Sequence, residues 1–140
     1  MKTNQEKRYL FTFCLLAGLM DLFSGALLMC LPVLTLKLMG VPPIAAEATV
    51  FIRFIGAFVF SVGSLYWFAL LSARSSGSQA TMGVLLSATA WVRTVVCLFT
   101  TVAIVSGALS SGWWTVPVTD GLLAAFQFWV ILKRWGFEND

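Results

Sequence analysis

Apolar residues run through the chain in four long blocks, separated by short segments that carry polar residues, proline or glycine. The blocks cover about 9–36, 46–71, 82–107 and 113–133. A helix needs about 20 apolar residues to cross the hydrocarbon of a bilayer, because each residue adds about 1.5 Å. The pattern therefore predicts an all-α, integral membrane four-helix bundle.

The composition supports a membrane protein. Hydrophobic residues make up 59% of the sequence and charged residues 11%, and the mean hydropathy is +0.91, whereas soluble domains are about 25% charged. We expect residues 1–140 to form a single transmembrane domain.

Proline and glycine mark the first breaks between the blocks. Pro32 removes a helical hydrogen bond and predicts a kink or an early helix end inside the first block. Gly40 and the pair Pro42 and Pro43 then exclude a continuous helix. The segment 72–81, rich in Ser and Gly, predicts a flexible connector.

Basic residues predict the orientation. Short cytoplasmic segments carry an excess of Lys and Arg, and only Lys37 lies on the side away from the two termini. An up-down-up-down path with both termini cytoplasmic follows, in a multi-pass protein of the cell inner membrane. Tyr66 is then expected at the inner headgroup level. The basic residues on the cytoplasmic side are Lys2, Lys7, Arg8, Arg74, Lys133 and Arg134.

Several function classes lack the residues they need. The sequence contains no histidine and only three scattered cysteines, so no metal site and no haem site are predicted. No basic cluster with interleaved aromatic residues is present, which argues against nucleic acid as a partner.

Four ionisable residues lie inside the apolar blocks, one in each: Asp21, Arg53, Arg93 and Asp120. A charge at the bilayer centre costs at least about 2.5–3.5 kcal/mol, so balanced opposite charges predict pairing inside the bundle. Depth along the helices favours Asp21 with Arg93 and Asp120 with Arg53, although the order of the helices could exchange these partners. Arg53 is also near enough to the outer end to reach the headgroups.

Small residues share helix faces with these charges, since residues three and four apart lie on one face. Gly18 and Gly25 accompany Asp21, and Gly56 and Gly63 accompany Arg53. Small residues allow membrane helices to approach closely, so these four glycines are predicted helix-packing positions. Gln127 lies on the face of Asp120 and adds a hydrogen-bonding group to the predicted cluster.

Two interpretations of this cluster remain open. The ion pairs could simply fix the register of the helices, as buried polar residues do in coiled coils. They could instead line a polar pocket for a lipid-like or quinone-like molecule, because charges within a membrane commonly mark functional sites.

A set of single residues also resembles a known family, the small DoxX-like four-helix membrane proteins of bacteria. The resemblance lies in Pro32, Gly40, the segment Arg53-Phe54-Ile55-Gly56-Ala57, Gly63, Arg93 and the acid in the fourth block. The residues of this sequence to which the family's pattern is carried over are Arg53, Gly56, Arg93 and Asp120. Some of these proteins are similar to subunits or partners of quinone-linked and redox enzymes, which implies an accessory role beside a membrane oxidoreductase.

Three hypotheses follow for function. The first is a non-catalytic membrane protein that binds a lipid or quinone, supports an oxidoreductase partner, or forms a homo-oligomer. The alternative is a small proton-coupled transporter, dimeric, in which Asp21 or Asp120 exchanges a proton while Arg93 binds an anion. An enzyme ranks last, because the sequence offers no nucleophile and base pair.

Overall fold

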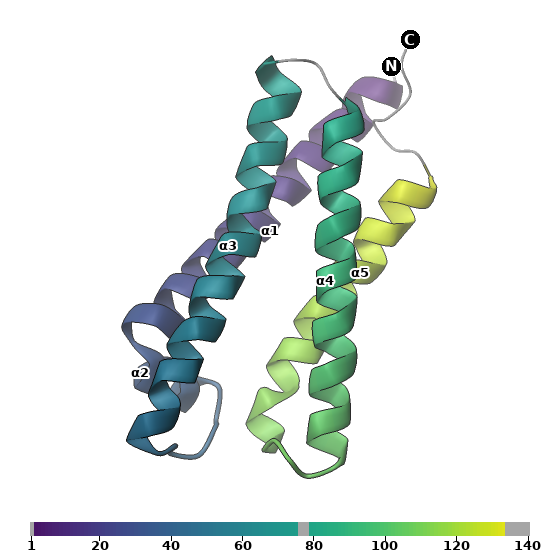
Figure 1. The fold of residues 1–140 in the computed structure, drawn as a ribbon. Coiled ribbons are helices and arrows are strands. Elements are labelled where there is room, and N and C mark those ends of the chain that lie inside the picture. Colours follow the sequence, from purple (N-terminus) through teal and green to yellow (C-terminus); the bar gives the residue numbers. More distant parts are fainter. Residues whose placement is uncertain (1, 76–78, 134–140) are drawn as a thin grey trace.

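The four apolar blocks form four long helices in a computed structural model, which describes the backbone of residues 2–75 and 79–133 and the side chains of 5–72 and 81–133. Short helical segments lie between some of them (Figure 1). In chain order the elements are α1 (Lys2–Cys30), α2 (Pro32–Leu38), η1 (Ala46–Ala48), α3 (Thr49–Ser75), α4 (Gln79–Val105), η2 (Ser111–Trp114) and α5 (Thr115–Leu132).

Four of these stretches are long and apolar enough to cross a membrane, which confirms the prediction of four such helices. They are Gln5–Cys30, Ala46–Ser72, Thr81–Val105 and Ser111–Leu132. The last three agree with the predicted blocks to within two residues at each end.

The first block ends earlier than the predicted boundary at 36. Leu31 leaves the helical conformation, with φ −130° and ψ 52°, and α1 stops at Cys30. Pro32 then opens the separate helix α2, at a position where its missing N–H costs nothing.

The predicted connector 72–81 is shorter than expected. Helix α3 continues to Ser75, and α4 begins at Gln79. Residues 76–78 of this segment and Arg134, which contributed to the predicted orientation, lie outside the described residues.

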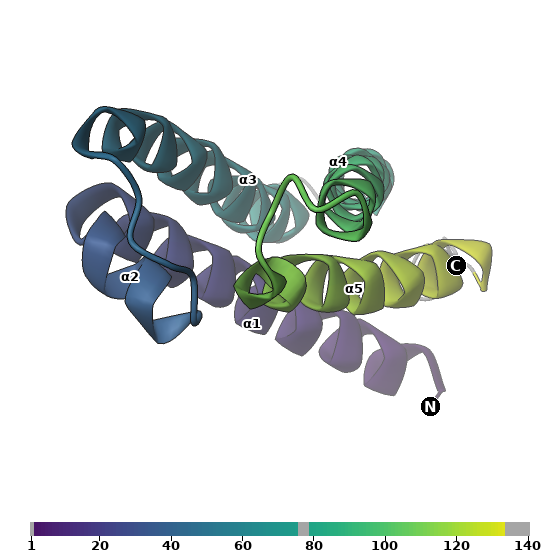
Figure 2. The ribbon, with the colours of Figure 1, turned by 90° about the horizontal axis from the view of Figure 1, so that it is seen from below.

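The long helices pair as two hairpins, α1 with α3 and α4 with α5. The start of α1 and the end of α5 lie at one end of the bundle, and α2, η1 and η2 lie at the other (Figure 1). Seen from that second end, the two hairpins stand side by side and α3 faces α4 (Figure 2).

Glycines bring α1 and α3 into backbone contact. A Cβ atom added at Gly25 would lie 2.5 Å from the Phe60 nitrogen, and one at Gly56 would lie 2.7 Å from the Met29 nitrogen. At Gly63 the added atom would lie 2.8 Å from Asp21 Cβ. Gly18 is as crowded, at 2.9 Å from Tyr66 Cβ. This glycine seam therefore leaves no room for any side chain between the two helices.

The buried apolar residues form two clusters rather than one continuous core. The larger cluster lies toward the end that holds the start of α1 and includes Leu10, Cys14, Leu86 and Val130. The smaller cluster lies at the opposite end and consists of Leu28, Leu36, Val41 and Ile52, with Trp113 of the second hairpin packed against it.

The loops of the two hairpins also meet at this opposite end. A Cβ atom added at Gly112 would lie 2.7 Å from the carbonyl oxygen of Gly40. The hairpins are thus joined at both ends of the bundle, and the space between the two buried clusters is not filled by a core.

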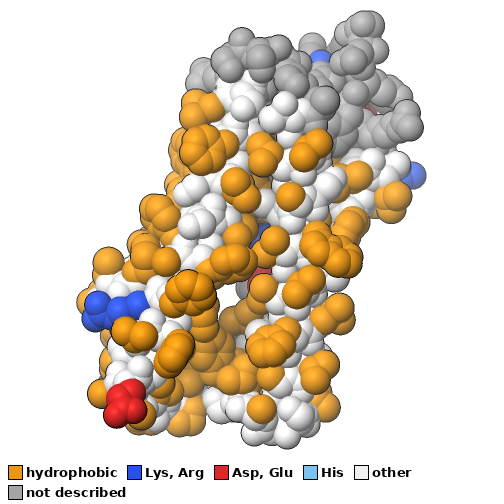
Figure 3. All heavy atoms as spheres, viewed as in Figure 1, with side chains coloured by type: hydrophobic (Ala, Val, Ile, Leu, Met, Phe, Trp, Pro, Cys, Tyr) orange, Lys and Arg blue, Asp and Glu red, His pale blue; other side chains and the backbone are white. Residues whose placement is uncertain are grey.

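Most described side chains on the face seen in Figure 3 are apolar, as expected for a surface in contact with lipid. Large side chains such as Phe23, Phe54, Trp91 and Leu122 are exposed. Charged side chains at Asp21 and Arg93 are buried instead, the reverse of the arrangement in a soluble protein.

Candidate functional site

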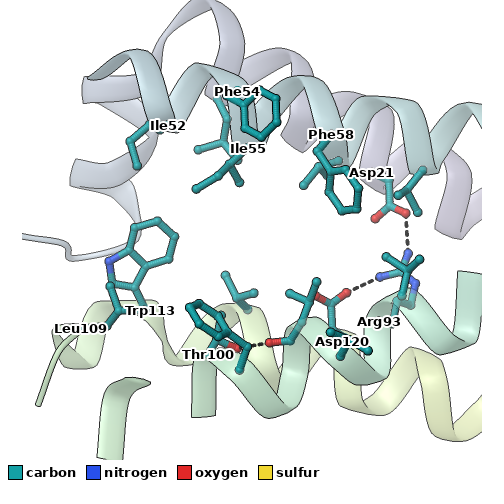
Figure 4. Close-up of a pocket in the computed structure, with 18 of the residues that line it drawn as sticks. Asp21, Ile52, Phe54, Ile55, Phe58, Arg93, Thr100, Leu109, Trp113 and Asp120 are labelled. Atoms are coloured by element: carbon teal, nitrogen blue, oxygen red, sulfur yellow. Dashed lines mark hydrogen bonds and ion pairs between the residues drawn. The ribbon is translucent and has the colours of Figure 1, made fainter. Parts of the chain in front are cut away.

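Arg93 on α4 lies between two acids from different helices. Its Nη2 atom donates a hydrogen bond to Asp21 Oδ2 of α1, and its Nη1 atom donates one to Asp120 Oδ1 of α5 (Figure 4). Both contacts are also ion pairs. Arg93 is 3% exposed and Asp21 is 4% exposed, so two members of this charged cluster of Asp21, Arg93 and Asp120 are buried, while the Asp120 side chain is 17% exposed.

Tyr66 on α3 engages the third nitrogen of the guanidinium. Arg93 Nε donates to Tyr66 Oη at 3.2 Å, and Arg93 Cζ lies 5.8 Å from the centroid of the tyrosine ring, within the range of a cation–π contact. Side chains from all four long helices therefore meet at one guanidinium.

Gln127 extends this network one layer further. Its Nε2 atom donates to Tyr66 Oη and to Thr89 Oγ1, both at 2.8 Å. Thr89 in turn donates to the backbone oxygens of Leu85 and Leu86. Gln127 is fully buried, and among the described residues its Oε1 atom has no hydrogen-bond partner.

The structure corrects two expectations for single residues. Tyr66 was expected at the headgroup level but is 1% exposed and bonded to Arg93. Asp120 was expected to pair with Arg53 but pairs with Arg93.

Arg53 does not join the charged cluster, because it lies near the end of α1. Gly56 already faces Met29, close to the last residue of α1. One turn earlier on α3, Arg53 lies at the level where α1 ends, and its exposed side chain lines a shallow surface pocket together with Cys30 and Lys37.

A cavity of about 540 Å³ lies between the two hairpins, and the charged cluster forms one end of it. Its walls are apolar over most of their area. Ile52, Ile55 and Phe58 come from α3 and Trp113 from η2 (Figure 4). Val96 and Phe99 of α4 also line it.

The cavity opens sideways between α3 and α4. Phe54 on α3 and Phe99 on α4 line it and are 71% and 69% exposed, so they form the rim of the opening. The same face of the molecule is hollowed in the space-filling view, with acidic and basic atoms visible inside (Figure 3).

This arrangement suits an amphiphilic molecule better than a metal ion. Over the described residues, no group of three or more His, Cys, Asp or Glu side chains is placed to hold a metal. The charged cluster offers hydrogen-bonding groups at one end of an otherwise apolar space, as small-molecule sites commonly do.

Comparison of the chain with protein-family models, with curated proteins and with solved structures finds no match. Function is therefore inferred from the cavity and its charges.

Proposed function

We propose that this protein binds a lipid-like or quinone-like molecule in the cavity between its hairpins. The polar head of the molecule lies at Asp21, Arg93 and Asp120, and its apolar tail lies along the walls formed by α3 and α4. The observation that carries this proposal is an apolar cavity of about 540 Å³ that ends on three charged side chains. Such a volume is within the range of about 300–1,000 Å³ typical of ligand pockets.

The cavity supports ligand binding over a purely structural role. Ion pairs that only fixed the helix register would be best served by close packing around them, because interiors are normally packed without large voids. Here the two ion pairs border an open space. The structural role explains the pairs but leaves the cavity without a purpose.

The proposal includes a membrane topology. The four helices cross a bacterial inner membrane in an up-down-up-down path, with the start of α1 and the end of α5 on the cytoplasmic side. The cavity then lies in the outer half of the bilayer, since Trp113 and Met39 line it and both come from the predicted outer segments.

An accessory role remains part of the proposal. The resemblance to DoxX-like proteins supports a place beside a membrane oxidoreductase, to which a bound quinone would be relevant. Anion transport has less support, because the charge of Arg93 is already paired with two carboxylates, Asp21 and Asp120.

Native mass spectrometry of the protein in a mild lipid extract tests the proposal. The parent protein should retain a small molecule, and the cavity-filling variant Val96→Phe should lose it. Val102→Phe makes the same change on the same helix at a position that is 66% exposed and outside the cavity lining, so it should retain the molecule. Equal retention by both variants would place the molecule elsewhere.

A further inference from the structure

We infer that the molecule bound in this cavity carries a cationic head group, an amine, rather than an anionic one. The inference rests on the proposed function and narrows it, because an amine head group retains the lipid-like ligand and excludes a quinone. It follows from how the charges at the end of the cavity are already used.

The charged cluster contains more acid than base. Asp21 and Asp120 both pair with Arg93, and of the charged side chains that line the cavity these are two acids to one base. With both carboxylates ionised, the cluster carries one negative charge in excess. In that state only a bound cation makes the cluster neutral, and a site within hydrocarbon strongly favours neutrality.

Each nitrogen of Arg93 is already hydrogen-bonded, so three of its five N–H groups are in use. Nε donates to Tyr66, Nη1 to Asp120 and Nη2 to Asp21. Nη1 and Nη2 each keep one further N–H, but an anionic head that accepted a hydrogen bond from either would lie beside two carboxylates. A carboxylate or phosphate ligand is therefore opposed by charge.

The acids, in contrast, keep acceptor capacity. Each carboxylate accepts one hydrogen bond from Arg93 and uses one of its two oxygens to do so, Oδ2 in Asp21 and Oδ1 in Asp120. The Asp120 side chain is 17% exposed, and both acids line the cavity (Figure 4). An ammonium group offers three N–H donors and no acceptor, which matches this end of the cavity.

The opposite end of the cavity supplies a reporter for the tail. Trp113 lines the cavity and precedes Asp120 by seven residues, about 10 Å along a helix. A tail that starts at the charged cluster and follows the apolar walls therefore reaches this tryptophan.

The test compares three amphiphiles that share one tail and differ in the head. They are ω-bromoundecylamine, ω-bromoundecanol and ω-bromoundecanoate, whose terminal bromine quenches tryptophan fluorescence. Each is titrated into the full chain in phosphatidylcholine nanodiscs. Trp113 is one of six tryptophans, so its signal is taken as the difference between the parent and Trp113→Phe. Quenching of Trp113 by amphiphile in the surrounding lipid does not saturate, so only the saturable part is counted as binding.

We expect saturable quenching of Trp113 by the amine at a concentration about tenfold lower than by the carboxylate, with the alcohol between them. Asp120→Asn should weaken the amine about tenfold and leave the alcohol unchanged. Thr119→Val, on the exposed face of α5, serves as the matched control and should change neither.

The outcomes separate the two proposals. Binding of the carboxylate as tightly as the amine would overturn the head-group inference while leaving the ligand site intact. Absence of saturable Trp113 quenching with all three amphiphiles would overturn the site itself. If Asp120→Asn does not fold, the comparison of head groups on the parent protein still decides the matter.

Discussion

At the scale of residues, the site depends on the shape of one side chain. The planar guanidinium of Arg93 reaches Asp21, Asp120 and Tyr66 through three different nitrogens. A lysine ammonium is a compact point charge on a flexible stem and cannot hold three helices in this fixed geometry.

Removal of the Arg93 charge should destabilise the bundle by about 3–5 kcal/mol, because two buried carboxylates would lose their partner. We expect this loss of unfolding free energy for Arg93→Met when reversible unfolding in SDS is monitored by circular dichroism. Arg53→Met removes the same group from an exposed position and should change the free energy of unfolding by less than about 0.5 kcal/mol. Similar losses for both variants would contradict the assignment of Arg93 as the central residue.

Tyr66 and Gln127 should show energetic coupling. Tyr66→Phe removes the hydroxyl that accepts from Arg93 Nε and Gln127 Nε2, and should cost about 1–3 kcal/mol because buried donors are left unpaired. In a Gln127→Leu background the same change should cost less, since one of those donors is already gone. A double-mutant cycle measures this difference, and strictly additive effects would argue against the shared hydroxyl.

The sequence predicted the buried charges at Asp21, Arg93 and Asp120 because each interrupts an apolar helix. It did not predict that Asp120 shares Arg93, since that depends on the lateral order of the helices and on where α1 ends relative to Arg53. Tyr66 was assigned from depth alone, and its place three residues after Gly63 on the packed face was the signal that pointed inward.

At the scale of elements, the glycine seam and the helix ends shape the site. Gly25 and Gly56 bring α1 and α3 together so closely that Asp21 reaches the space between the hairpins. The periodicity of small residues was readable from the sequence. Pro32 predicted the early end of the first helix, which lies at Cys30. The helical turns that shorten the connector after Ser72 were not predicted, because Ser and Gln are compatible with both helix and loop.

Gly56→Ala should therefore destabilise the first hairpin by about 1–3 kcal/mol, since the added atom would meet backbone atoms that cannot move aside. Ala57→Val enlarges the neighbouring residue on the exposed side of α3 and should have little effect. SDS unfolding of the two variants compares them directly. A tolerated Gly56→Ala would mean that the two helices are less tightly held than their packing indicates.

At the scale of the whole molecule, the two hairpins are joined at both ends and separated between them. Four apolar helices followed directly from the lengths of the blocks. The cavity did not follow from the sequence, because a void depends on how the two hairpins pack against each other. The residues on one helical face do not determine that packing.

The proposed topology can be tested with fusions in a bacterial host. Green fluorescent protein attached after the last residue should fluoresce, because that end is expected in the cytoplasm. Alkaline phosphatase fused after Gly107, in the segment between α4 and η2, should be active on the other side. An inactive phosphatase together with a dark fluorescent protein would reverse the orientation and place the cavity in the inner half of the bilayer.

The contact between Gly40 and Gly112 limits how a molecule can enter the cavity. With the loops in contact beyond Trp113, the way in is the gap between Phe54 and Phe99, which faces the acyl chains. Under the proposed function, an occupant arrives by two-dimensional diffusion within the leaflet, where apolar molecules are already concentrated by partitioning. Its occupancy then depends on its mole fraction among the lipids multiplied by its preference for the cavity over the surrounding chains, so a scarce molecule needs a strong preference and an abundant one does not.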